Sequence, residues 1–171
     1  MNIALTGFMA SGKTKISKHL SKQLGYNLID TDNLIVSEMN MSINDIFEKF
    51  GEKKFREIEH KIISQCAGYK NTVISTGGGV PLNPENMISL RTHAVIVNLA
   101  PKFEVISERL SRARGSRPLL KDSSISDIEK RFNDRLPYYA DCDLKIEVSN
   151  EFGPEYFAEK ICDKLKLILN E

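Results

Sequence analysis

The sequence has 171 residues, with 24 basic and 23 acidic side chains and a formal net charge of +1 at pH 7. This length suits one domain with a sizeable core. The composition, in which 41% of the residues are apolar and 27% are charged, excludes a disordered or fibrous chain. Because the charges balance, the whole chain has no field that would attract nucleic acid or an anionic membrane. We therefore expect a globular protein without a nucleic-acid partner, whose anion sites are local.

The cysteines and the beginning of the chain bear on the compartment. Cys66, Cys142 and Cys162 are odd in number and form no C-x-x-C pair, which disfavours a disulfide framework and a zinc knuckle. No apolar run approaches the roughly 18–20 residues of a membrane span, and no basic segment precedes a signal-type apolar stretch. We expect reduced thiols, no membrane partner, a cytoplasmic location and a monomer.

Five short apolar runs bounded by turn residues predict buried strands. In chain order they are Asn2–Thr6, Asn27–Ile29, Thr72–Ser75, His93–Leu99 and Leu144–Val148. Apolar residues three or four positions apart predict helices at Lys13–Leu24, Ile43–Cys66, Phe103–Arg112, Ser126–Tyr138 and Tyr156–Leu169. This alternation predicts an α/β fold with a doubly wound five-stranded parallel sheet and helices on both faces. Ligands of such sheets bind beyond the carboxyl ends of the strands.

Two stretches interrupt the alternation of strands and helices. Residues 31–60 read as a helical insertion, longer than a simple crossover needs, and we assign it to substrate binding. Residues 112–123 contain Gly, Ser, Arg and Pro and are predicted to form a mobile lid. We expect both to be parts of one domain that spans residues 1–171.

The segment from Gly7 to Thr14 matches the pattern G-x-x-x-x-G-K-[ST]. Such a loop turns backbone N–H groups onto phosphate oxygens, and the positive end of the following helix points at the same anion. Lys13 would neutralise the β- and γ-phosphates, and Thr14 would offer a hydroxyl to Mg²⁺. A chance glycine turn is the alternative, but the motif follows an apolar strand and opens an amphipathic helix, as phosphate loops do. We therefore predict ATP as the ligand.

Two carboxylates, Asp30 and Asp32, follow the second predicted strand. On extended backbone their side chains would point to the same side, toward the ligand crevice. One would hold waters around Mg²⁺, and the other would orient an acceptor hydroxyl or accept its proton. The alternative is that Asp30 or Thr31 caps a following helix.

Arg56 and Glu59 lie three residues apart on one face of a predicted helix. The pair is either a solvated surface ion pair or, given its place in the insertion, a preorganised fork for a substrate carboxylate. Gly77-Gly78-Gly79 follow the third strand, where they form either a flexible turn or a place where backbone approaches a ligand closely. We favour a binding role for both features.

Arginines gather in and after the predicted lid. They are Arg112, Arg114, Arg117, Arg131 and Arg135. An arginine delivered by a closing loop can stabilise the charge on a transferred phosphoryl group while the loop excludes water. For Arg112 and Arg114, an ordinary role as surface charges is equally compatible with the sequence.

Together these patterns resemble the shikimate kinases, members of the nucleoside-monophosphate-kinase-like P-loop proteins, over nearly the whole chain. The matching residues are the phosphate loop, Asp30-Thr31-Asp32, Gly51-Glu52-x-x-Phe55-Arg56-x-x-Glu59, Gly77-Gly78-Gly79, Arg117-Pro118-Leu119-Leu120 and Arg135-x-x-Tyr138. The resemblance implies Mg²⁺-dependent transfer of the γ-phosphoryl group of ATP to the 3-hydroxyl of shikimate, a step toward chorismate and the aromatic amino acids.

The resemblance also implies roles for individual residues. The catalytic residues would be Asp32, as candidate base, with Lys13 and Arg117. ATP would be bound by Ala10, Ser11, Gly12, Lys13, Thr14, Lys15, Arg109, Arg112 and Arg117, with Arg109 or Arg112 packing on adenine. Shikimate would be bound by Asp32, Arg56, Gly77, Gly78, Gly79 and Arg135. Thr14 and, through water, Asp30 would hold the metal ion.

The chain departs from the family pattern at Ala10, which stands where a loop glycine is usual, and at Lys15 and Ser17 after the loop. An alanine strains the turn if that position needs a positive φ. Two rival functions remain. A kinase for another small acid, such as gluconate, should not need both Arg56 and Arg135, and a non-catalytic nucleotide-binding protein should have lost Asp32 or Arg117.

Overall fold

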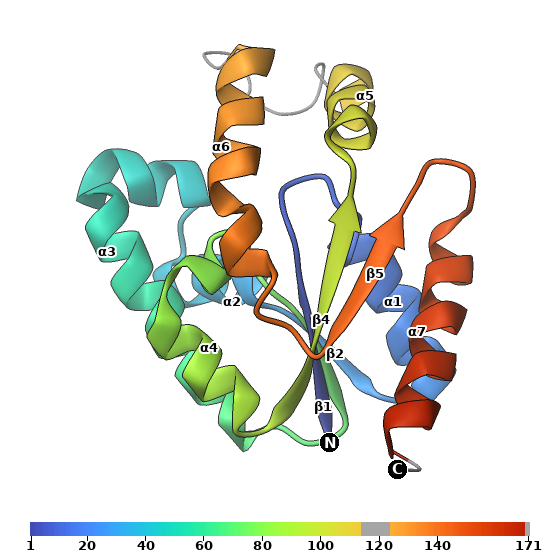
Figure 1. Cartoon of the computed structure of the whole chain (residues 1–171). Helices are drawn as coiled ribbons and strands as arrows, with labels where there is room; N and C mark the ends of the chain where they lie inside the picture. Colours follow the sequence, from blue (N-terminus) through green and yellow to red (C-terminus); the bar gives the residue numbers. More distant parts are fainter. Residues whose placement is uncertain (114–123, 170–171) are drawn as a thin grey trace.

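The computed structural model describes residues 1–113 and 124–169 and is built around one parallel sheet (Figure 1). The strands are β1 (Asn2–Thr6), β2 (Asn27–Asp30), β3 (Thr72–Ser75), β4 (Ala94–Pro101) and β5 (Leu144–Val148). They lie in the order β2-β3-β1-β4-β5, and every neighbouring pair is parallel. The predicted fold class, an α/β protein with a five-stranded parallel sheet, is confirmed.

Seven helices connect and flank these strands in the described part of the chain. They are α1 (Lys13–Leu24), α2 (Thr31–Met39), α3 (Ile43–Gln65), α4 (Pro84–Arg91), α5 (Phe103–Ala113), α6 (Ile125–Tyr139) and α7 (Pro154–Leu169), with 3₁₀ turns at Cys66–Gly68 and Val80–Leu82. Helices α2 and α4 were not delimited from the sequence. One uninterrupted helix was predicted from residue 43, whereas α3 is broken at Gly51, whose φ of 77° and ψ of 171° are not helical.

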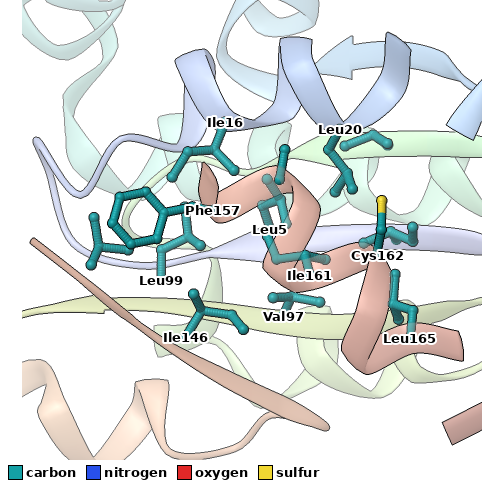
Figure 2. Close-up of a cluster of buried hydrophobic side chains, with 14 residues drawn as sticks. Leu5, Ile16, Leu20, Val97, Leu99, Ile146, Phe157, Ile161, Cys162 and Leu165 are labelled. Atoms are coloured by element: carbon teal, nitrogen blue, oxygen red, sulfur yellow. The ribbon is translucent and has the colours of Figure 1, made fainter. Parts of the chain in front are cut away.

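The central strands are buried on both faces, as parallel sheets require. On one face, Leu5, Val97 and Leu99 of the sheet pack against α1 and α7, where Ile16 and Phe157 contribute to the same cluster (Figure 2). On the other face, the sheet packs against α3 and α4. Figure 1 shows both termini at the end of the sheet opposite the carboxyl edge.

Two smaller clusters extend the protein around the carboxyl edge of the sheet. Helices α2 and α3 share an apolar cluster that includes Ile35 and Phe55, within the segment predicted as an insertion. Phe8, in the turn after β1, packs against α5 and α6, and its ring centroid lies 5.3 Å from that of Phe132. Because of the packing around Phe8, α5 and α6 lie at the phosphate-loop end of the sheet.

Two further predictions concern the lid and the membrane. The lid predicted at residues 112–123 lies outside the described residues except for its first two positions. None of the helices within residues 1–113 and 124–169 is long and apolar enough to span a bilayer.

Candidate active site

The loop after β1 has the backbone geometry of a phosphate loop. Gly7 and Gly12 have φ values of 143° and 104°, a region in which a side chain would be strained. Between them, Phe8 anchors the loop in the α5–α6 cluster, and Ser11 is fully buried. Helix α1 begins at Lys13, directly after Gly12, so its positive end lies at the loop. The loop therefore has the glycine conformations and the helix start that the predicted anion site requires.

The first residues of α1 carry the side chains predicted to meet the nucleotide. The Lys13 ammonium donates to the carbonyl oxygens of Gly7, at 2.7 Å, and Phe8, at 2.9 Å, so its charge lies at the mouth of the loop. Thr14 and Lys15 are exposed on the first helical turn. All three therefore lie beside the loop, where a bound phosphate chain would meet them.

Ala10 has a φ of 58°, in the left-handed region that glycine usually occupies. The condition for strain at this position, a positive φ, is therefore met, and in that conformation Cβ comes close to the backbone. Helix α1 nevertheless begins three residues later, at Lys13.

The arginines of α5 differ in what they contact. Arg109 donates from Nη1 to the carbonyl oxygens of Ala10 and Ser11, both at 3.0 Å, and burial lowers its pKa. Arg112 is exposed and pairs with Glu108 on its own helix. Of the two arginines predicted to pack on adenine, Arg109 thus contacts the phosphate loop and Arg112 does not. Arg114 and Arg117 lie outside the described residues.

The path of the chain after β2 differs from the prediction. Asp30 and Asp32 were expected on extended backbone, but α2 begins at Thr31 and Asp30 is its N-cap. The Asp30 carboxylate accepts hydrogen bonds from the backbone N–H groups of Asp32 and Asn33. The helix-capping alternative is therefore correct for Asp30, since a strand that turns straight into a helix leaves N–H groups that need an acceptor.

Asp32 lies in the first turn of α2 and faces the carboxyl edge of the sheet. A Cβ placed on Gly77 would lie 2.7 Å from Asp32 Oδ1 and 3.1 Å from Glu59 Oε1, so both carboxylates pack against that glycine. Burial raises the pKa of the Asp32 carboxyl, and the neighbouring Asp30 adds to the rise. Lys13 and Arg56 oppose it, so Asp32 feels the positive charges of the phosphate-loop lysine and the α3 arginine.

Two carboxylates on α3 hold the Arg56 side chain in place. Its Nη1 lies 2.8 Å from Glu59 Oε2 and its Nη2 lies 3.2 Å from Glu52 Oε1. Glu59 is 1% exposed, and burial raises its pKa while the pair with Arg56 opposes the rise. A buried partner makes the pair far more rigid than a surface ion pair. The alternative of a solvated surface pair is therefore wrong.

The glycine triplet after β3 provides the space for these side chains. A Cβ on Gly79 would lie 2.2 Å from Arg56 Nη1, and a Cβ on Gly77 would meet Asp32 and Glu59. Real Cβ atoms essentially never approach that closely, whereas Gly78 would meet its neighbours only at ordinary contact distance. A freely flexible turn is excluded, because Gly77 N–H also donates to Thr31 Oγ1 at 3.0 Å.

Helix α6 brings Arg135 and Tyr139 to the same place. The Arg135 guanidinium carbon lies 5.9 Å from the ring centroid of Phe8, and Tyr139 donates its hydroxyl to the Gly78 carbonyl at 2.7 Å. Burial raises the pKa of Tyr139, and Arg135 opposes the rise. The helix therefore adds a positive charge and a hydroxyl group between the phosphate loop and the glycine triplet.

Tyr139 was not identified from the sequence, where Arg135 was paired with Tyr138 instead. Tyr138 is 46% exposed, whereas Tyr139 is buried. A signal was available in the sequence. Ile128 and Phe132 form the buried face of α6, and a helical period continued from them reaches Arg135 and Tyr139.

The donors near the loop fit a magnesium ion that is held mainly by phosphate. Within the described residues, no group of three or more His, Cys, Asp or Glu side chains could hold a metal ion on its own. Mg²⁺ normally keeps several waters and takes one or two protein oxygens plus substrate phosphates. Asp30 is rigid enough for that role, since Ser75 also donates to its Oδ2 at 3.1 Å, and Thr14 offers an exposed hydroxyl.

Comparisons with known proteins show the family to which this chain belongs. The family model for shikimate kinase matches residues 9–166. A shikimate kinase from Caldicellulosiruptor bescii is 48% identical over 161 residues, covering 94% of this chain and 92% of that protein.

Two solved structures are similar over nearly their whole length. Shikimate kinase from Bacteroides thetaiotaomicron has a TM-score of 0.89 at 28% identity, covering 97% of this chain and 98% of that chain. Shikimate kinase from Acinetobacter baumannii in complex with shikimate has a TM-score of 0.87 at 32% identity, covering 99% of this chain and 93% of that chain. Because the family model and a relative that is 48% identical both cover nearly the whole chain, the chain belongs to the shikimate kinase family.

Proposed function

We propose that this protein transfers the γ-phosphoryl group of ATP to the 3-hydroxyl of shikimate, giving shikimate 3-phosphate and ADP. The observation that carries the proposal is the Arg56 guanidinium, fixed by the buried Glu59 against Gly79 beside a phosphate loop. A fixed guanidinium suits a planar carboxylate, which it can bind through two parallel hydrogen bonds. Arg135, close to Phe8 of the loop, supplies a second positive charge for the same carboxylate.

At the nucleotide end, the backbone of the phosphate loop binds the phosphates and Lys13 neutralises their charge. The Lys13 ammonium donates to the Gly7 and Phe8 carbonyls, which holds its charge at the mouth of the loop, where the phosphates of ATP would lie. Thr14 and, through water, Asp30 would hold Mg²⁺. When bound, this ion neutralises charge on the transferred phosphoryl group. We further propose that Arg117 arrives with the predicted lid and meets the phosphates.

At the acceptor end, Asp32 orients the shikimate hydroxyl and accepts its proton. Its raised pKa makes it a stronger base than an exposed aspartate, and the nearby Lys13 and Arg56 oppose the rise. The Asp30 side chain is occupied by the α2 N-terminus and Ser75. Of the two carboxylates, Asp32 is therefore the one available to the acceptor.

The test is a coupled assay of ADP release by the purified protein with Mg·ATP and one acceptor at a time. The acceptors are shikimate, gluconate and a nucleoside monophosphate. We expect turnover with shikimate and only background ATP hydrolysis with the others. Turnover with gluconate and none with shikimate would replace the proposed acceptor.

We propose that the protein works as a single-domain monomer in the cytoplasm, which gel filtration with light scattering checks for the oligomeric state.

A further inference from the structure

Arg109 of α5 joins three segments that are far apart in the sequence. Its Nη1 donates to the carbonyl oxygens of Ala10 and Ser11, both at 3.0 Å. Its Nη2 donates to the Ser149 carbonyl at 3.0 Å, and its Nε donates to Asn150 Oδ1 at 2.8 Å. These four hydrogen bonds fix the guanidinium in orientation as well as in place, because a planar fork has little freedom once both edges are bonded.

The two loop carbonyls that Arg109 binds belong to the strained part of the phosphate loop. Ala10 has a φ of 58°, which costs energy for any residue with a Cβ. The other non-glycine residues with positive φ in the described ranges are Asn40 and Asn71, and asparagine tolerates this region because its side chain bonds the local backbone. Alanine has no such side chain. The compensation for Ala10 therefore has to come from elsewhere in the structure.

Fixing these carbonyls also fixes the N–H groups that follow them. In a trans peptide, the C=O of one residue and the N–H of the next point in opposite directions. When Arg109 holds the Ser11 carbonyl toward α5, the Gly12 N–H points away from α5, at the start of α1. Phosphate loops bind anions through N–H groups, so their orientation decides affinity.

We propose that Arg109 is a positioning residue that holds the strained backbone at Ala10 and Ser11 in the conformation that binds phosphate. The inference rests on the proposed function, since it takes the loop as the phosphate site. It assigns to Arg109 a role different from packing on adenine, because the guanidinium acts through the loop backbone. Asn150 and Ser149, in the turn before α7, hold the other edge of the guanidinium.

Inorganic tripolyphosphate separates these roles, because it carries the phosphates of ATP without the adenine ring. We would measure by calorimetry the binding of tripolyphosphate and of ATP to the full-length wild-type protein and to Arg109→Met. We expect Arg109→Met to weaken both by the same factor, about tenfold for the loss of two hydrogen bonds to the loop. Weaker ATP binding with unchanged tripolyphosphate binding would overturn the proposal in favour of a contact with adenine.

A second substitution at Arg109 tests whether its positive charge alone explains phosphate binding, and an arginine elsewhere provides the control. Arg109→Lys keeps the charge but lacks the fork, and we expect it to bind tripolyphosphate as weakly as Arg109→Met does. If Arg109→Lys binds tripolyphosphate as tightly as the wild-type protein does, the positive charge at residue 109 attracts the anion directly. That result would overturn the proposal. Arg131→Met, on an exposed position of α6, is the matched control and should bind tripolyphosphate like the wild-type protein.

The link to strain at Ala10 is tested by Ala10→Gly, since glycine adopts a positive φ without a Cβ penalty. In this background we expect Arg109→Met to weaken tripolyphosphate binding only about twofold instead of about tenfold. An equal loss in both backgrounds would overturn the proposal. If Arg109→Met does not fold, Asn150→Ser, which removes the hydrogen bond that Arg109 Nε donates to Asn150, should give the same pattern with a smaller loss of affinity. A wild-type protein that binds no tripolyphosphate would refute the phosphate loop itself, which the shikimate assay checks independently.

Discussion

The phosphate loop and the glycine triplet follow neighbouring strands, β1 and β3, yet their glycines meet different physical needs. Gly12 has a φ of 104°, which a residue with a Cβ adopts only under strain. Gly79 has a φ of −93°, open to any residue, but a Cβ there would lie 2.2 Å from the Arg56 guanidinium. Gly12 is needed because the backbone there has a positive φ, and Gly79 is needed because the Arg56 side chain lies where a Cβ would be.

This difference follows from how each region binds its ligand. The phosphate loop presents backbone N–H groups, so its own dihedral angles determine the site. The acceptor region presents carboxylates and guanidinium groups from α2, α3 and α6, and the triplet leaves room for them between the helices. Variants that affect only one of the two regions therefore test whether each region binds its own ligand independently. The largest expected effects come first.

The largest effect is expected from Asp32→Asn, which removes the proposed base from the acceptor region. General-base catalysis contributes about 10²–10⁴ in rate, so kcat should fall within that range while the KM for shikimate changes by less than about threefold. Initial rates at saturating ATP measure both constants. An Asp32→Asn enzyme with near-normal kcat would remove Asp32 from the chemistry.

The same variant should be more stable than the wild-type protein at neutral pH. The pKa of Asp32 is raised from its ordinary value of 3.8, so folding favours its protonated form, and the protein loses stability as pH rises through the raised pKa. Asparagine carries no charge at any pH. Thermal unfolding should show a gain of about 1 kcal/mol at pH 7.5 that disappears near pH 4. A gain that persists at pH 4 would contradict this origin.

Arg56→Met should mainly abolish shikimate binding, because the substitution removes the guanidinium but keeps most of the side-chain volume. Losing a charge-assisted pair of hydrogen bonds costs roughly 3–4 kcal/mol, so kcat/KM for shikimate should fall about 10²–10³-fold with the KM for ATP unchanged. Lys54→Met, an exposed position that pairs with Glu57 on the same helix, is the control. A parallel rise in both KM values would mean that the acceptor and phosphate regions are not independent.

Gly79→Ala should raise the KM for shikimate about 10–100-fold by displacing the Arg56 guanidinium, with little change in the KM for ATP. Gly12→Ala is its counterpart in the phosphate loop and should raise the KM for ATP instead. Gly68→Ala is the matched control, because a Cβ there meets nothing within 4 Å. If Gly79→Ala binds shikimate normally, close approach is not the reason for glycine at this position.

The smallest effect is expected from Tyr139→Phe, which removes the hydrogen bond to the Gly78 carbonyl. A neutral hydrogen bond contributes about 0.5–1.5 kcal/mol, so the KM for shikimate should rise about three- to tenfold. Tyr138→Phe, at an exposed position, should leave it unchanged. The reverse ranking would restore Tyr138, the residue predicted from the sequence, as the one that supports the site.

The sequence by itself determined the features that depend on short stretches of chain. The strand from Asn2 to Thr6, the loop and the helix from Lys13 to Leu24 were predicted with the bounds that the structure has. Burial of short apolar strands and the dihedral needs of a glycine loop are both encoded locally. The positive φ of Ala10 was raised as a question by its departure from the family pattern, which usually has a glycine at this position.

Tertiary structure alone decided which distant groups meet. It brought Ser75 to the Asp30 carboxylate, gave Gly77 and Gly79 their crowded neighbours, and turned Arg109 toward the loop carbonyls rather than into solvent. Each of these contacts joins segments whose relative position depends on how the helices pack on the sheet. No periodicity or spacing within one segment contains that information, so the residue types were recognisable and their partners were not.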